Sequence, residues 1–209
     1  MPQPRVVVVG ADRLPGWCER FAERHGAVAA CVDEGALVLL AGDGSWARLR
    51  PPVGELPGDG IAALVAELRH PRRVGVLAVR RGGFACVVVV QGRLVASKAG
   101  RRHVQGRTAA GGWSQQRFAR RRDKQVHELV EAVVGHAVRI LVPHLPLDAL
   151  VTAGDPPLVD DVLADPRLRG LAAVPRGLNL AAGDPDGAWV AALPALLASA
   201  QITVLDVTR

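Results

Sequence analysis

Three strand-like runs separated by very short turns constrain the fold of this chain more than any other feature. The runs cover residues 74–79, 84–90 and 94–103, with turns at Arg81-Gly82-Gly83 and Gln91-Gly92. Turns of two or three residues join neighbouring antiparallel strands. Because the run 84–90 is continuously apolar, we expect it to be a central strand buried on both faces.

The second half of the chain alternates between helical and strand-like patterns. After a glycine- and arginine-rich loop over 98–112, the spacing of apolar residues predicts a long helix over 114–142. The elements expected after it are strand 149–153, helix 157–164, strand 171–174, helix 187–200 and strand 202–207. Three adjacent strands followed by this alternation predict an α/β fold, a mixed sheet with flanking helices.

A smaller α/β unit is expected to precede this domain. Strand-like runs at 5–10, 27–32, 36–40 and 46–49 accompany a helical pattern over 13–25. A segment rich in proline and glycine then covers 51–60, and a helix is expected over 61–69. The sequence therefore predicts two domains, residues 1–70 and residues 71–209.

Charge is distributed very unevenly along the chain. The segment from Arg72 to Lys124 holds 14 of the 26 basic residues and a single acidic residue, Asp123. The rest of the chain has 12 basic and 19 acidic residues, a net charge of −7. Such segregation is typical of a surface that binds phosphates, because a merely solvated surface usually mixes both signs.

The residues 111–122 carry the most specific motif, Gly-Gly-Trp-Ser-Gln-Gln-Arg-Phe-Ala-Arg-Arg-Arg. Gly111 and Gly112 allow close approach of the backbone to a ligand. Gln115 and Gln116 offer uncharged amides that donate and accept hydrogen bonds. The arginines that follow suit phosphate contact, so the local chemistry predicts a loop tip that enters a nucleic-acid environment.

This stretch resembles the Gly-Gly-Gln loop and following helix in the middle domain of archaeal and eukaryotic class I peptide-chain release factors. That family also has Arg-Phe-Ala-Arg after its loop, as Arg117-Phe118-Ala119-Arg120 stands here. The resemblance extends over roughly residues 73–200 and is strongest to the VLRF-type peptidyl-tRNA hydrolases of ribosome quality control, including actinobacterial members. It implies a ribonuclease-H-like release-factor middle-domain fold.

One difference from the family concerns the catalytic glutamine. In the ungapped register Trp113 occupies its place, and the glutamines follow at 115 and 116. The quality-control branch has a looser Gly-Gly-Ser-Gln type of loop, which favours Gln115, preceded by Ser114; Gln116 is the alternative. Trp113 beside two glycines is expected to pack on RNA bases or on the loop itself.

The resemblance implies hydrolysis of peptidyl-tRNA at the peptidyl-transferase centre of the large ribosomal subunit, with ribosomal RNA as a further partner. The catalytic group would be Gly111, Gly112, Ser114, Gln115 and Gln116, which position water without a cofactor or metal. The expected RNA-binding residues are Arg101, Arg102, Arg107, Trp113, Arg117, Arg120, Arg121, Arg122 and Lys124. The alternative from another class is a non-catalytic RNA-binding factor associated with the ribosome.

Other chemistries find less support in the residues. A two-metal nuclease needs carboxylates, yet no Asp or Glu occurs between Arg73 and Arg122. Gly10 stands without the further glycines of a dinucleotide-binding turn. The histidines 127, 136 and 144 lack the spacing of two metal ligands on one helical face. A serine hydrolase would need His103 to approach Ser114.

The remaining composition bears on location. Cys18, Cys31 and Cys86 are scattered without metal-ligand spacing, which fits a reducing compartment. No apolar run reaches the ~20 residues of a membrane helix, and residues 6–9 are too short for a signal-peptide core. A cytoplasmic protein is expected, and its oligomeric state stays open.

Overall fold

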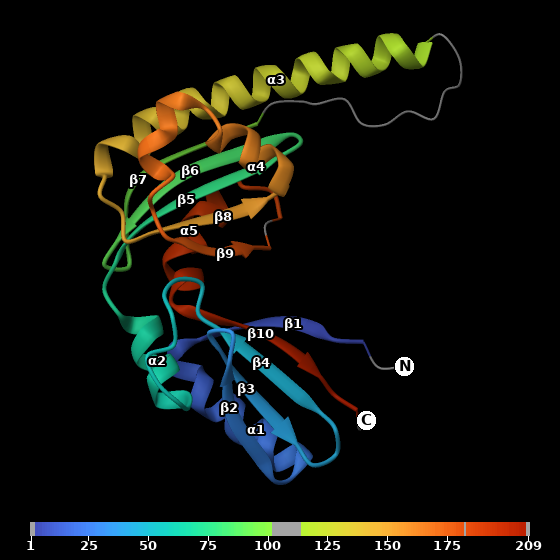
Figure 1. The fold of residues 1–209 in the computed structure, drawn as a ribbon, viewed down its shortest axis with the longest axis vertical. Coiled ribbons are helices and arrows are strands. Elements are labelled where there is room, and N and C mark those ends of the chain that lie inside the picture. The colour runs from blue at the N-terminus through green and yellow to red at the C-terminus, as the bar shows by residue number, and fades with distance from the viewer. Residues whose placement is uncertain (1–2, 102–113, 182, 208–209) are drawn as a thin grey trace. The chain divides into compact units, whose positions relative to one another are not determined.

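Two five-stranded sheets carry the fold in the computed structural model, which describes residues 3–101, 114–181 and 183–207 (Figure 1). For residues 114–123 it describes the backbone and not the side chains. The chain divides into two compact units, each with one of the sheets. Unit 1 comprises residues 1–72 and 193–209, and unit 2 comprises residues 73–192.

The sheet of unit 1 is antiparallel throughout, in the order β1-β10-β4-β3-β2. Its strands are β1 (Arg5–Gly10), β2 (Val28–Asp33), β3 (Ala36–Ala41), β4 (Trp46–Arg50) and β10 (Ser199–Leu205). The helices are the short η1 (Ala11–Arg13), α1 (Leu14–His25) and α2 (Ile61–Arg69).

The core of unit 1 lies between these helices and one face of the sheet. Apolar residues of α1 and α2 recur at helical spacing, while alternate residues of the strands point to the same side. The largest fully buried side chains of this core are Leu14, Leu37, Leu49, Leu64 and Ile202. Burial of each such side chain contributes about 1.5–3 kcal/mol.

The last strand corrects the predicted domain boundary. β10 pairs with β1 and with β4, so residues 193–209 belong to unit 1, although a second domain over 71–209 was expected. Strand pairing between the two ends of a chain leaves no local pattern in the sequence. The apolar alternation of residues 199–205 predicts a strand but not its partner.

Unit 2 has a mixed sheet in the order β7-β6-β5-β8-β9. β5 (Arg73–Arg80), β6 (Gly83–Val90) and β7 (Arg93–Arg101) are antiparallel neighbours. β8 (Ala149–Gly154) runs parallel to β5, and β9 (Arg176–Leu180) runs parallel to β8. The α/β class and the mixed sheet with flanking helices are therefore confirmed.

Both predicted turns between the first strands of unit 2 are confirmed. Gln91 and Gly92 both have positive φ, 51° and 73°, which gives the turn the twist that a two-residue hairpin needs. Residues 98–101, predicted to lie in a loop, instead continue β7. They pair with the start of β6, where Gly100 lies opposite Phe84.

The helices of unit 2 are α3 (Ser114–Ile140), α4 (Pro156–Leu163) and α5 (Gly187–Leu197), which continues into unit 1, with short 3-10 turns η2 (Val142–His144) and η3 (Pro166–Leu171). Side chains of α3, α4 and η3 form one core with β5, β6 and β8.

The strand predicted over 171–174 is wrong. Leu168, Leu171 and Val174 are buried at a spacing of three residues, which suits the 3-10 turn η3 and its exit. The strand forms after Pro175, as β9.

Candidate nucleic-acid interface

The long helix α3 carries most of the predicted site, and the described side chains of its second half are built into the core. Full burial begins at Leu129 and continues through Val133, Val134 and Ala137. At 1.5 Å per residue, the 27 residues of α3 span about 40 Å. Among the described side chains, core contacts of α3 begin at Val126, and the helix before this residue accounts for about 18 Å of that length. In Figure 1 this part of α3 extends beyond the strands of unit 2.

The predicted catalytic residues lie at the start of this extended part. Ser114, Gln115 and Gln116 occupy the first turn of α3, while Gly111 and Gly112 precede it outside the described residues. Consecutive helical positions lie about 100° apart around the axis, so positions 115 and 116 lie on different faces of α3. The backbone therefore makes the two glutamines distinct candidates.

The predicted RNA-binding residues fall into two groups. Arg102, Arg107 and Trp113 lie outside the described residues, and Arg101 is exposed at the end of β7. The others follow one another along α3. Positions 117, 120, 121 and 124 share one face of the helix, because residues three and four apart are neighbours; position 122 lies off this face. Lys124, the first whose side chain is described, is exposed.

Three described cations near β7 and the first half of α3 are not ion-paired with any described residue. The strands β5, β6 and β7 contain no Asp or Glu. Lys98, Arg101 and Lys124 form no ion pair with any residue in the described parts of the chain. Unpaired cations of this kind remain available to phosphate groups.

The other end of α3 is held by ion pairs. Arg167 donates to both carboxylate oxygens of Glu131, at 2.9 and 2.7 Å, and also to Asp165. The hydrogen bonds from Arg167 lower the pKa of Asp165 to about 2 and also lower the pKa of Glu131. Sequence reasoning missed this cluster, because 36 residues separate Arg167 from Glu131. It ties α3 to η3 at the end away from the predicted site.

Two aromatic contacts fix the end of β7 against α3. A Cβ on Gly100 would meet the Phe84 ring at 2.7 Å, so glycine is required where this ring crosses the strand. Phe84 stacks on His136 of α3, with 5.0 Å between ring centroids. Burial, followed by the nearby Arg139 and Lys98, lowers the pKa of His136. His136 is thus a packing residue rather than a metal ligand.

The rival chemistries gain nothing from the structure. No cluster of His, Cys, Asp and Glu suited to a metal occurs among the described residues. His144 contacts the carbonyl oxygen of Ile140 at 2.9 Å, and His127 is exposed. No helix in the described parts of the chain is long and apolar enough to cross a membrane. His103 lies outside the described residues, so its approach to Ser114 stays untested.

Comparison with known proteins places the chain among the translation release factors. Residues 72–203, well over half of the chain, match the profile of the family described as Actinobacteria/chloroflexi VLRF1 release factor. This chain belongs to that family. The matched segment begins at residue 72, one residue before unit 2, and ends within β10.

A solved structure was also found, the archaeal translation termination factor aRF1. The two share 14% sequence identity with a TM-score of 0.42, over 85% of this chain and 51% of the archaeal one. The chain thus spans about half the length of that factor. No curated protein matches the sequence.

Proposed function

We propose that this protein hydrolyses peptidyl-tRNA at the peptidyl-transferase centre of the large ribosomal subunit, releasing nascent chains from stalled ribosomes or large subunits in the cytoplasm. The observation that carries the proposal is the placement of Gln115 and Gln116 in the first turn of a helix whose ribbon extends beyond the strands of unit 2 (Figure 1). Because the chain belongs to a release-factor family, we interpret these two glutamines as the candidates for the catalytic residue.

We further propose that unit 2 has the ribonuclease-H-like fold of a release-factor middle domain. Numbered within the unit, its strands have the order 3-2-1-4-5, with the first three antiparallel and the last two parallel to the first. This order supports the fold assignment. The absence of carboxylates from β5 to β7 argues against nuclease chemistry on this scaffold.

The proposed mechanism uses positioning rather than a strong base. The glutamine amide, with backbone N–H groups near Gly111 and Gly112, orients water against the ester carbonyl. The first N–H groups of α3 lack partners within the helix and carry a partial positive charge. They are suited to stabilise the oxyanion that forms as water attacks. The terminal ribose hydroxyl of the tRNA and ribosomal RNA supply the remaining contacts.

Binding to the ribosome is assigned to the cations around this helix. They belong to a segment of the sequence that has no acidic residue from Arg73 to Arg122. Their phosphate contacts hold unit 2 in place while the loop reaches the tRNA terminus. The residues proposed for this role are Arg101, Arg102, Arg107, Arg117, Arg120, Arg121, Arg122 and Lys124, with Trp113 stacking on bases.

One assay tests the proposal against the alternative of a non-catalytic RNA-binding factor. Large subunits bearing radiolabelled peptidyl-tRNA are incubated with the protein, and released peptide is measured over time. We expect release by the wild type and a loss of ~10²-fold or more in a Gln115→Ala/Gln116→Ala double variant. The matched control is Gln125→Ala, three turns further along the same helix, which should release at the wild-type rate.

Each outcome decides between the two functions. Binding without release by the wild type would establish the non-catalytic factor. Full release by the double variant would exclude a catalytic role for the glutamine amides, while the assignment of hydrolase activity to the protein would stand. Because no charge changes, cosedimentation of the double variant with large subunits should equal that of the wild type.

A further inference from the structure

Unit 1 has a small pocket of its own. It has a volume of about 160 Å³ and is formed by α1 together with β1 and β10. The described residues that line it combine arginines with aromatic rings: Arg5, Trp17, Arg20, Phe21, Arg24, His25, Val204 and Asp206. All of them belong to unit 1.

One face of α1 supplies the wall of the pocket. Trp17, Arg20, Phe21 and Arg24 are spaced by three or four residues, so they line up along the same side of the helix. The ring of Trp17 stacks on that of Phe21, with 5.7 Å between centroids and 13° between planes. Phe21 is buried and Trp17 half-buried. A ring held in this way is a suitable platform for a further planar group.

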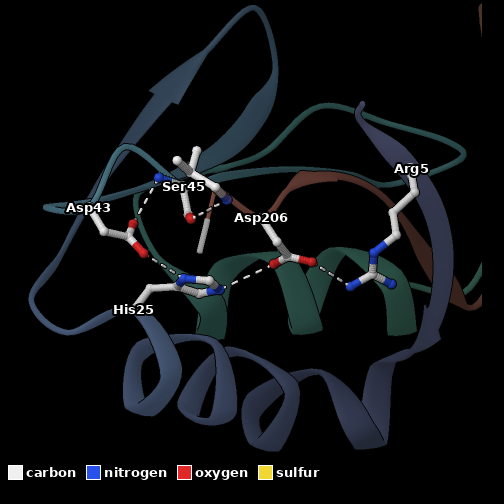
Figure 2. A network of polar contacts seen from close by, with 6 residues as sticks. Arg5, His25, Asp43, Ser45 and Asp206 are labelled. Atoms are coloured by element: carbon white, nitrogen blue, oxygen red, sulfur yellow. Dashed lines mark hydrogen bonds and ion pairs between the residues drawn. The ribbon is translucent and has the colours of Figure 1, made fainter. Parts of the chain in front are cut away.

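A hydrogen-bonded network (Figure 2) holds three of the residues that line the pocket, Arg5, His25 and Asp206. The side chain of His25 is fully buried, with Nδ1 2.8 Å from Asp43 Oδ2 and Nε2 3.1 Å from Asp206 Oδ1. The other oxygen of Asp206 accepts a hydrogen bond from Arg5 at 2.9 Å. Ser45 donates its backbone N–H to Asp43 and accepts, at Oγ, from the N–H of Val207.

Ion pairing compensates the charge of the Asp206 carboxylate. Arg5, and then His25, lower its pKa below the ordinary value, so the group stays ionised and paired. Both of its oxygens are occupied, so Asp206 offers no free acceptor, and the guanidinium of Arg5 reduces its repulsion of an anion that enters the pocket.

Arg20 and Arg24 are unusual among the arginines of unit 1. Neither forms an ion pair or hydrogen bond with a residue in the described ranges. Both are exposed and lie four residues apart on the helix face beside Trp17. Most other arginines of the unit are paired with acids, namely Arg5, Arg48, Arg50, Arg69 and Arg72.

We propose that this pocket binds single-stranded RNA, with phosphate groups on Arg20 and Arg24 and a base stacked against Trp17. The charge of the pocket requires an anion, and the exposed part of the Trp17 ring requires a planar group close to that anion. Consecutive nucleotides supply both, whereas an acidic peptide supplies carboxylates alone. The site goes beyond the proposed function, because it gives unit 1 its own RNA contact, independent of α3.

Binding of a labelled ten-nucleotide oligouridylate to the full chain tests this inference. The variant Arg20→Gln/Arg24→Gln is compared with Arg48→Gln/Arg69→Gln, which removes the same charge from arginines that are already ion-paired. The first variant should bind at least about fivefold more weakly, because it loses two charged hydrogen bonds to phosphate. Its salt dependence should flatten by roughly 1.4 in log–log slope, about 0.7 for each phosphate released. The control should match the wild type.

Crosslinking then locates the contact within the chain. An oligonucleotide containing 4-thiouridine should crosslink within residues 14–25, and Trp17→Leu should abolish this crosslink while crosslinks to the basic segment 101–124 persist. Thermal melting checks that each variant is folded. Equal weakening in both double variants, or no crosslink within 14–25, would overturn the proposal. So would equally strong competition by a glutamate decapeptide. None of these outcomes depends on peptide release, so the hydrolase proposal is tested separately.

Discussion

At the scale of single residues, the two adjacent glutamines pose the sharpest question. Their positions in α3 differ by about 100°, so one orientation of the helix in the active centre suits only one amide. We expect Gln115→Ala to slow peptide release by ~10²-fold or more and Gln116→Ala to change it little. The reverse pattern, measured by the same release assay, would assign the role to Gln116. Subunit binding should be unchanged in both variants.

The three cysteines differ in their surroundings, which gives a second prediction at this scale. Burial raises the pKa of Cys18 to about 11 and that of Cys86 to about 12, whereas Cys31 is exposed on β2. Only the thiolate reacts with disulfide reagents. At pH 8 the folded protein should react rapidly at Cys31 alone, and all three thiols should react in denaturant. If the folded Cys31→Ser variant also reacted rapidly with the reagent, Cys18 or Cys86 would be accessible, which would contradict their burial.

At the scale of the elements, α3 joins an anchored half to a basic half. The anchored half is held by its apolar core and by the ion pairs of Arg167, and the basic half carries the predicted phosphate contacts. Replacing Arg120, Arg121 and Arg122 with alanine should weaken binding to large subunits and flatten its salt dependence by roughly 2 in log–log slope, about 0.7 per phosphate. Thermal stability should be unchanged, since these positions precede the packed part. An unchanged salt slope would show that these arginines contact no phosphate.

Local patterns in the sequence predict most of these elements. The turn at Gln91-Gly92, the long helix from residue 114 and the buried strand over 84–90 are all visible in the sequence as glycine position, helical spacing or an apolar run. A strand was predicted over residues 171–174 because a short apolar run, such as the one with Leu171 and Val174, fits a strand as well as a 3-10 turn. The residues of the candidate site also come from the sequence, through charge and resemblance. Their arrangement does not, because the loop 102–113 lies outside the described residues and the Arg167 cluster joins distant segments.

At the scale of the whole molecule, the sequence of unit 2 is inserted within that of unit 1. The first 72 residues and the last 17 build one sheet, and the segment between them forms the other. Unit 1 therefore cannot complete its sheet until β10 has been made. The periodicity of apolar residues predicts a strand but not a pairing between strands as far apart in the sequence as β1 and β10. This is why the domain boundary was misplaced.

The dependence of unit 1 on its last strand can be measured directly. β10 lies between β1 and β4, and its residues Ala200, Ile202 and Val204 are almost completely buried. Ile202→Ala should destabilise unit 1 by about 2–5 kcal/mol, since it leaves a cavity between sheet and helices. The neighbouring Thr203→Ala, on the opposite face of the strand, should change stability by only about 0.5 kcal/mol.

Removal of residues 199–209 should have a larger effect that is confined to one unit. Without β10, β1 loses the strand with which it pairs and one side of β4 is left unpaired. The apolar faces of α1 and α2 then lose part of their sheet surface. Hydrogen exchange followed by mass spectrometry should show rapid exchange in peptides from residues 3–72 and continued protection in β5, β6 and the second half of α3. Protection of β1 in the shortened chain would mean that unit 1 completes its sheet without β10, and the inserted arrangement would then not control its folding.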